Sequence, residues 1–244
     1  MATLTTAPRS DGGISLRDPG APPPTGGNGW SDSDFFAMRL RRARLGMLVA
    51  VIGIVMIFVS FTSAYVVRQG LPTFDGRTNS LVYDWLAVPL PVLLLVNSFV
   101  LLLSTVTMEL ARRQAGRDLA LSRVISVGDS SSISEKSDSR ISWLALTVIL
   151  GFSFLAGQLT VWRELAAAGF YVGATPSSSF LYLLTGMHGL HLLGGVIALL
   201  VAGAASVLRK SAATRFVLLD VTSWYWHFMA VLWIYILCLF EFVR

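Results

Sequence analysis

The sequence predicts an all-α integral membrane protein in which five transmembrane helices form one bundle. Of its 244 residues, 54% are hydrophobic and only 14% are charged, and the mean hydropathy is +0.66. Five apolar runs are each long enough to cross roughly 30 Å of hydrocarbon, which takes about 20 residues in a helix. Because these runs are continuously apolar and do not alternate with polar residues, a membrane β-barrel is excluded.

Charged residues mark the ends of the apolar runs, which cover about residues 45–67, 85–110, 141–162, 179–208 and 216–243. Arg44 and Arg68 flank the first run, and Asp84 precedes the second. Arg163 follows the third run and Arg209 follows the fourth. The fourth run is longer than the hydrocarbon requires, so we expect this helix to tilt or to project from the membrane. Together the helices define a membrane domain over residues 35–244.

The placement of the basic residues predicts the orientation of the chain. Most of the 19 Lys and Arg residues lie before the first run, between the second and third, or after the fourth, which are all on one side. The positive-inside rule therefore places the N-terminus in the cytoplasm and the C-terminus outside. The sequence pI of about 9.8 is thus a topology signal, and no nucleic acid partner is expected. Residues 1–34, which are poor in apolar side chains, are expected to form a disordered cytoplasmic tail.

Ionisable residues inside a membrane are costly and usually functional. The carboxylates nearest the membrane are expected at or near helix ends, and they are Asp84, Glu109, Glu164, Asp220 and Glu241. A proton pump or ion-coupled transporter normally needs a carboxylate near the midplane. The absence of one from the middle of any predicted span argues against transport.

Three histidines remain inside the predicted spans, His188 and His191 in the fourth and His227 in the fifth. His188 and His191 lie about 60° apart on one helix face, so they cannot take opposite axial positions on one haem, although either could pair with His227. The alternative is hydrogen bonding between helices or contact with lipid headgroups. Because the chain has a single cysteine, Cys238, and few other candidate ligands, we expect no catalytic, cofactor-binding or metal-binding residues.

The remaining polar, small and aromatic residues of the spans suit helix packing. Glycines of the fourth span would let neighbouring helices approach closely, which predicts that this helix is the packing centre; they are Gly186, Gly189, Gly194 and Gly195. Gln158 is of the type that ties helices together. The tryptophans of the third and fifth spans, among them Trp162, Trp226 and Trp233, suit interfacial belts and large packing surfaces.

Two motifs resemble one known family. Residues 180–200, FLYLLTGMHGLHLLGGVIALL, resemble the penultimate helix of subunit III of the haem-copper terminal oxidases, whose recurring core is T-G-x-H-G-x-H. Residues 226–233, WHFMAVLW, are similar to the final helix of that family. Further similarities follow in the same order, at Gly46, Ser63 to Tyr65, Asn97, Gln158 and Trp162. The resemblance covers about residues 36–244, and it matches the five-helix form found among bacterial cytochrome c and quinol oxidases.

The resemblance implies an accessory subunit that is not catalytic by itself. It implies that this chain binds no cofactor, that haem and copper are held by partner subunits, and that its partners are oxidase subunits I and II and membrane lipids. The implied location is the plasma membrane of a bacterium, with the chain crossing it several times. The residues expected in the polar packing core or in lipid contact are Gly186, His188, Gly189, His191, Trp226, His227, Trp233, Gln158 and Trp162.

Three positions depart from the family pattern that the resemblance brings. Ile54 stands where many members carry a buried glutamate, Val161 where a glutamate often precedes the aromatic residue, and Ala230 where many members have an aspartate. Two other functions stay open from the sequence: a subunit III-like partner of a nitric oxide reductase, and a small membrane transporter or scaffold. The sequence also leaves open whether the electron donor of the complex is cytochrome c or quinol.

Overall fold

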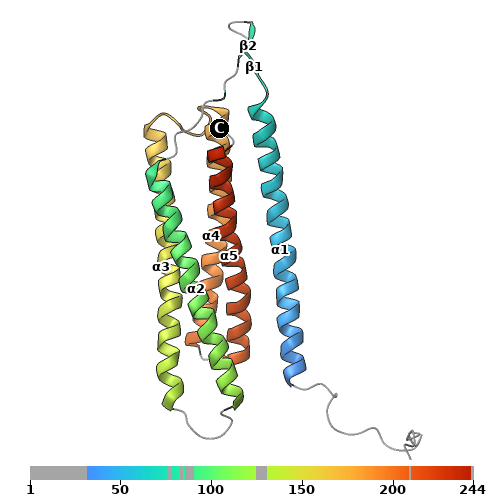
Figure 1. The fold of residues 1–244 in the computed structure, drawn as a ribbon, viewed down its shortest axis with the longest axis vertical. Coiled ribbons are helices and arrows are strands. Elements are labelled where there is room, and N and C mark those ends of the chain that lie inside the picture. The colour runs from blue at the N-terminus through green and yellow to red at the C-terminus, as the bar shows by residue number, and fades with distance from the viewer. Residues whose placement is uncertain are drawn as a thin grey trace, which may run out of the picture.

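The computed structural model confirms an all-helical membrane protein with five spanning helices. It describes residues 32–75, 79–82, 85, 91–124, 131–208 and 210–242. The helices are α1 (Asp32–Gln69), α2 (Val92–Val124), α3 (Ser131–Ala167), α4 (Pro176–Val207) and α5 (Ala212–Phe242). Each contains a stretch that is long and apolar enough to cross a membrane. The helices run alternately up and down, so α1 begins at the end of the bundle opposite to the end of α5 (Figure 1).

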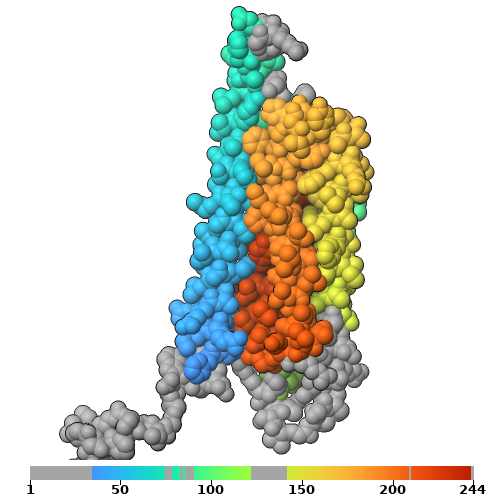
Figure 2. Space-filling model, turned by 180° about the vertical axis from the view of Figure 1, so that it is seen from behind, coloured from blue at the N-terminus to red at the C-terminus, as the bar shows by residue number. Residues whose placement is uncertain are grey.

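Helices α2, α3, α4 and α5 form a tight bundle, and α1 lies at its side. Helix α2 packs against α3 and α5, and α4 packs against α3 and α5. Among the described helices, only α4 and α5 pack against α1, and Figures 1 and 2 show α1 along one side of the bundle. Only 11% of the most apolar stretch of α1 is buried, whereas the corresponding share of α5 is 44%. Most of the α1 surface therefore faces lipid or another chain.

The expected packing centre, α4, shares that place with α5, because each of the two packs against three other helices. The buried share of the apolar stretch is 39% in α4 against 44% in α5. Large side chains of α5 take part in this packing, because Trp226 and Trp233 are fully buried between their neighbours. By contrast, a side chain at Gly189 of α4 would meet no atom within 4 Å, so this glycine does not bring another helix close.

A short antiparallel hairpin follows α1 at the end of the bundle where α5 ends. Strand β1 (Thr73–Asp75) pairs with β2 (Ser80–Val82), with Thr73 opposite Val82. The hairpin is anchored by Arg68 in the last turn of α1, which donates hydrogen bonds to the Leu71 carbonyl (3.0 Å) and to Thr73 Oγ1 (2.7 Å). The strands are too short for the alternating pattern by which a sequence reveals a strand.

Helix ends differ from the ends of the apolar runs. Helix α2 begins at Val92, directly after Pro91, and not at residue 85. Trp85 lies outside the helix. Helices α1, α2 and α3 also extend into polar sequence, since water at the membrane surface does not end a helix that can keep its own hydrogen bonds. The last residues of the tail predicted for 1–34 belong to α1, which starts at Asp32. Residues 1–31 lie outside the described residues.

The start of α4 shows a local signal that apolar-run counting ignores. Thr175 accepts a hydrogen bond from the Ser178 backbone N–H (3.1 Å), and Ser178 Oγ accepts one from the Thr175 backbone N–H (3.2 Å). This reciprocal capping box satisfies backbone donors that the first helical turn leaves free. Pro176, which needs no such partner, occupies the first helical position. The helix therefore begins three residues earlier than the apolar run predicted, at Pro176.

Candidate functional site

The three histidines lie in three different surroundings. His188 is completely buried, and its ring packs between Phe154 of α3 and Trp233 of α5, with centroids 6.0 and 5.0 Å away. His191 lies one turn further along α4, where its Nδ1 is 2.7 Å from the Met187 carbonyl oxygen of the same helix. Its ring faces α1, 6.0 Å from the ring of Phe58. The two motif histidines therefore connect α4 to different neighbours.

The third histidine belongs to a charged region. His227 Nε2 on α5 lies 3.7 Å from Glu109 Oε2 on α2. Across residues 32–75, 79–82, 85, 91–124, 131–208 and 210–242, no three His, Cys, Asp or Glu side chains gather in a way that could hold a metal ion. Each of the three histidines therefore contacts a different neighbour, and their imidazole rings do not meet at one site.

The motif tryptophans tie α5 to α2 through buried hydroxyl groups. Trp226 Nε1 donates to Ser104 Oγ and Trp233 Nε1 donates to Ser98 Oγ, each at 2.9 Å. All four side chains are buried, so both indole donors are satisfied without water. The serines were among many polar residues in the spans, and nothing in the linear sequence indicates which hydroxyl meets which indole.

Trp162 forms the matching link between α3 and α4. Its Nε1 donates to Thr185 Oγ1 at 3.1 Å, and its carbonyl accepts a hydrogen bond from the Tyr182 hydroxyl at 3.0 Å. A Cβ on Gly186 would lie 3.5 Å from the Trp162 ring, which is ordinary contact. Gln158, one turn before Trp162 on α3, is 3% exposed, and neither of its polar side-chain atoms has a hydrogen-bond partner.

Close packing depends on two α3 glycines whose role the sequence does not indicate. A Cβ at Gly151 would lie 2.9 Å from the ring of Trp226. A Cβ at Gly157 would overlap the side-chain oxygen of Asn97, whose Nδ2 donates to the Phe154 carbonyl at 3.0 Å. These glycines let α3 approach α2 and α5. Gly195 has a comparable role in α4, where a Cβ would lie 3.0 Å from the ring of Tyr225.

A buried aspartate joins three helices near the end of the bundle where α1 begins. Asp220 of α5 is 0% exposed, and its Oδ2 accepts a 2.8 Å hydrogen bond from Arg44 Nε of α1. Its Oδ1 lies 3.6 Å from Arg112 Nη1 of α2. Arg112 also pairs with Glu109 through two 2.8 Å hydrogen bonds. The sequence predicts both carboxylates near helix ends and uses the arginines only to predict orientation, and no pattern in it indicates that these groups pair.

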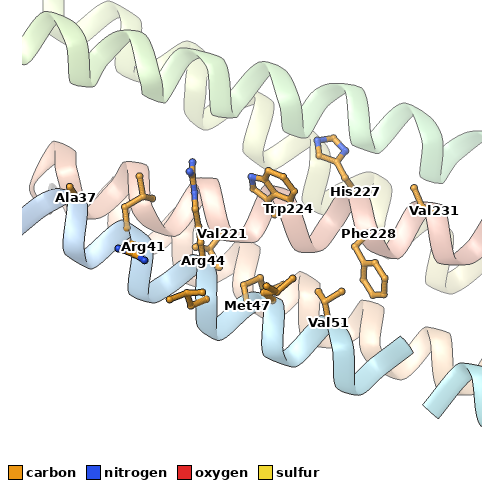
Figure 3. A pocket seen from close by; sticks show the side chains of 13 residues that line it. Ala37, Arg41, Arg44, Met47, Val51, Val221, Trp224, His227, Phe228 and Val231 are labelled. Atoms are coloured by element: carbon orange, nitrogen blue, oxygen red, sulfur yellow. The ribbon is translucent and has the colours of Figure 1, made fainter. Parts of the chain in front are cut away.

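An apolar groove of about 710 Å³ runs between α1 and α5 beside this charge cluster. Figure 3 shows its walls, formed by α1 from Ala37 to Val51 and by α5 from Val221 to Val231. Arg41 and Arg44 of α1 lie toward one end of the groove, and His227 of α5 lies further along it, near Val51 and Val231. The remainder is lined by apolar and aromatic side chains, including Trp224. A long apolar groove with cationic groups at one end has the shape and chemistry of a phospholipid site.

Comparison with known proteins decides the family. The family model described as cytochrome c oxidase subunit III matches residues 35–243. The chain belongs to the cytochrome c oxidase subunit III family. The match covers the membrane-spanning part of all five helices, which agrees with the resemblance of the two histidine-containing motifs.

Individual relatives of this subunit III family member come from bacteria and from an animal. The chain is 36% identical over 105 residues to a probable cytochrome c oxidase subunit 3 of Mycobacterium tuberculosis, covering 42% of this chain and 50% of the relative. It is 33% identical over 103 residues to the cytochrome bo(3) ubiquinol oxidase subunit 3 of Pseudomonas aeruginosa, covering 42% and 48%. It is 28% identical over 198 residues to the cytochrome c oxidase subunit 3 of Branchiostoma lanceolatum, covering 79% and 66%. The chain thus spans about half the length of the bacterial relatives it matches.

The three departures from the family pattern all lie in the subunit III core. Ile54 is 8% exposed, Val161 is 1% exposed and Ala230 is 4% exposed. Each side chain belongs to the continuous apolar core formed by the five helices. A carboxylate at any of them would need a buried partner, and this chain places an apolar group there instead.

Proposed function

We propose that this chain is the accessory, non-redox subunit III of a bacterial haem-copper terminal oxidase. It lies in the plasma membrane beside subunits I and II, stabilises subunit I, and leaves electron transfer to oxygen and proton translocation to the haem and copper centres of those partners. The observation that carries the proposal is the family match over residues 35–243. Because relatives are named as oxidases of both cytochrome c and ubiquinol, the proposal covers either electron donor.

The internal geometry supports a role in packing for the conserved-motif residues. Trp226 and Trp233 bind serine hydroxyls, Trp162 binds a threonine hydroxyl, and His188 packs between two aromatic rings. These contacts hold α2, α3, α4 and α5 together. They give the motif a structural use that needs no bound metal or haem.

The exposed face of α1 supports a need for partners. Among the described helices, only α4 and α5 pack against it, and most of its apolar side chains are exposed. We propose that the end of the bundle where α1 begins faces the cytoplasm, since Arg41, Arg42 and Arg44 lie there with Arg112 and Arg113 of α2. A basic cluster at that membrane surface would also attract anionic lipid headgroups.

The experiment that tests the function is gentle extraction of the affinity-tagged chain from its own membranes. We expect it to purify with a larger subunit that gives haem absorption bands, in a complex that consumes oxygen. Mass spectrometry of the partner distinguishes an oxidase from a nitric oxide reductase. Recovery of the chain alone from a detergent that keeps other respiratory complexes intact would contradict the proposal.

Lipid occupancy of the α1–α5 groove is a separate part of the proposal. We expect native mass spectrometry of the purified complex to detect retained phospholipid, and we expect Arg41→Gln to reduce it because Arg41 lines the groove. Arg42→Gln is the matched control, since this neighbouring residue is exposed but does not line the groove. Equal lipid retention by both variants would show that the groove is not the site.

A further inference from the structure

His188 and Gln158 are among the buried side chains whose polar atoms have no hydrogen-bond partner. His188 is 0% exposed and Gln158 is 3% exposed. Neither ring nitrogen of His188 and neither polar atom of the Gln158 amide has a hydrogen-bond partner. The imidazole and the amide are consequently not hydrogen-bonded to each other. Buried polar groups in native proteins are nearly always paired, with protein or with ordered water, so these four atoms require an explanation.

Contacts on either side place Gln158 and His188 in the same layer between α3 and α4. On α3, Phe154 packs against the ring of His188, with centroids 6.0 Å apart. Gln158 lies one helical turn beyond Phe154 on the same face, and Trp162 lies one turn further. Trp162 in turn bonds Thr185, which precedes His188 by one turn on the antiparallel helix α4. Gln158 is thus held between two α3 residues that both contact α4 next to His188.

The other polar groups of this layer are already satisfied. Thr185 donates to the Leu181 carbonyl at 2.7 Å and accepts from Trp162. The indole of Trp233, which stacks on His188, donates to Ser98 on α2. Neither Thr185 nor Trp233 has a donor left for the imidazole or the amide. Among the described residues of this layer, the polar atoms that still need hydrogen-bond partners are those of Gln158 and His188.

A water molecule meets those needs. A neutral imidazole offers one donor and one acceptor, and a primary amide offers two donors and an acceptor oxygen. Water supplies two donors and two acceptors, and buried waters typically serve polar groups that would otherwise be unsatisfied. In a membrane the alternative of leaving these groups unpaired is costly, because the surrounding hydrocarbon offers no partner.

We propose that Gln158 and His188 together bind resident water between α3, α4 and α5. The water links the amide of α3 to the imidazole of α4 and fixes which ring nitrogen of His188 carries the proton. This assigns the first histidine of the T-G-x-H-G-x-H motif to a water-mediated contact between helices. The inference depends on the position of the two side chains and is independent of the oxidase function proposed above.

The small number of histidines makes the site directly observable. The chain contains only three, so labelling with ¹⁵N-histidine gives three ring systems for solid-state NMR of the full chain in lipid bilayers. His188→Asn assigns the His188 signal by removing it. Magnetisation is then transferred from water protons to the ring nitrogens. We expect transfer to His188 in the unmodified chain, although its ring has no exposed surface.

Two variants separate the proposed site from general water penetration. Gln158→Leu should abolish water transfer to His188, whereas Thr160→Val should leave it unchanged. Thr160 is an exposed α3 residue whose hydroxyl bonds the Gly157 carbonyl of its own helix. If the unmodified chain shows no transfer to His188, or shows a direct amide–imidazole contact, the inference is wrong. Transfer that persists unchanged in Gln158→Leu would overturn it as well, because the site requires both side chains.

Discussion

Arg44 and Asp220 form an ion pair, and replacing one partner should change the stability of the protein more than replacing the other. Asp220 is 0% exposed, whereas half of the Arg44 side chain (50%) reaches the surface. Replacing Arg44 by methionine leaves a buried carboxylate with Arg112 as its remaining partner. Replacing Asp220 by asparagine removes the buried charge itself and leaves arginines that can turn outward. We therefore expect Arg44→Met to destabilise the protein more than Asp220→Asn.

The distances set the size of the effect. At 2.8 Å and 3.6 Å, the pairs of Asp220 with Arg44 and with Arg112 attract by about 6 and about 5 kcal/mol at an effective dielectric constant of about 20. Because Arg44 is half exposed, screening by water reduces the attraction between Arg44 and Asp220 to roughly 3 kcal/mol. This value lies at the low end of the cost of breaking a buried pair, about 3–5 kcal/mol. Asp220→Asn keeps a hydrogen-bonding amide and should cost about 1 kcal/mol.

The assay is equilibrium unfolding in mixed micelles, with tryptophan fluorescence as the signal that monitors unfolding. Arg44→Met should shift the unfolding equilibrium about a hundredfold, since 1.4 kcal/mol corresponds to a factor of ten. The double variant Arg44→Met/Asp220→Asn should recover most of that loss, because no buried charge remains. Arg42→Met, at an exposed residue of the same helix, is the control and should change stability by less than about 0.5 kcal/mol. Equal single effects that add in the double variant would refute the argument.

Three further predictions concern packing and cofactors. Trp226→Phe should cost about 2 kcal/mol in the same assay, because it leaves a buried hydroxyl without its indole donor, whereas Trp224→Phe at a 63% exposed site should be nearly neutral. Gly157→Ala should cost about 1–3 kcal/mol because the new Cβ overlaps an amide of α2, while Gly53→Ala, with no atom within 4 Å, should be neutral or slightly stabilising. His191→Leu should leave the haem absorption bands of the purified complex unchanged while the complex still assembles. A lost haem band with intact assembly would show that His191 is a ligand.

The five spans could be predicted because crossing a membrane is a property of each segment alone. Every apolar run of sufficient length became a spanning helix, whatever its neighbours. The helix ends required local chemistry instead. Pro91 lies directly before the first residue of α2, and the Thr175–Ser178 capping box starts α4. Both signals are present in the sequence, but they concern hydrogen bonds of single turns and not hydropathy.

The surroundings of the histidines could be predicted only in part. A separation of about 60° correctly puts His188 and His191 near one another on α4. It does not reveal that α4 has different neighbours on either side, so that His188 faces α3 and α5 while His191 faces α1. A small rotation around a helix changes the partner completely when three helices surround it. Side-chain environment therefore depends on the arrangement of the bundle.

The arginines near the start of α1 show how one residue can carry two kinds of information. Counting basic residues by segment predicts orientation, and for that purpose all arginines are equivalent. In the structure they are not equivalent, because Arg44 pairs with an aspartate 176 residues away and Arg112 joins both carboxylates of the cluster. A test of orientation by charge removal should therefore avoid Arg44 and Arg112, where loss of folding would mimic a change of topology. Substitution of the exposed Arg42 and Arg117 changes the charge balance without removing a partner of Asp220, so it tests orientation alone.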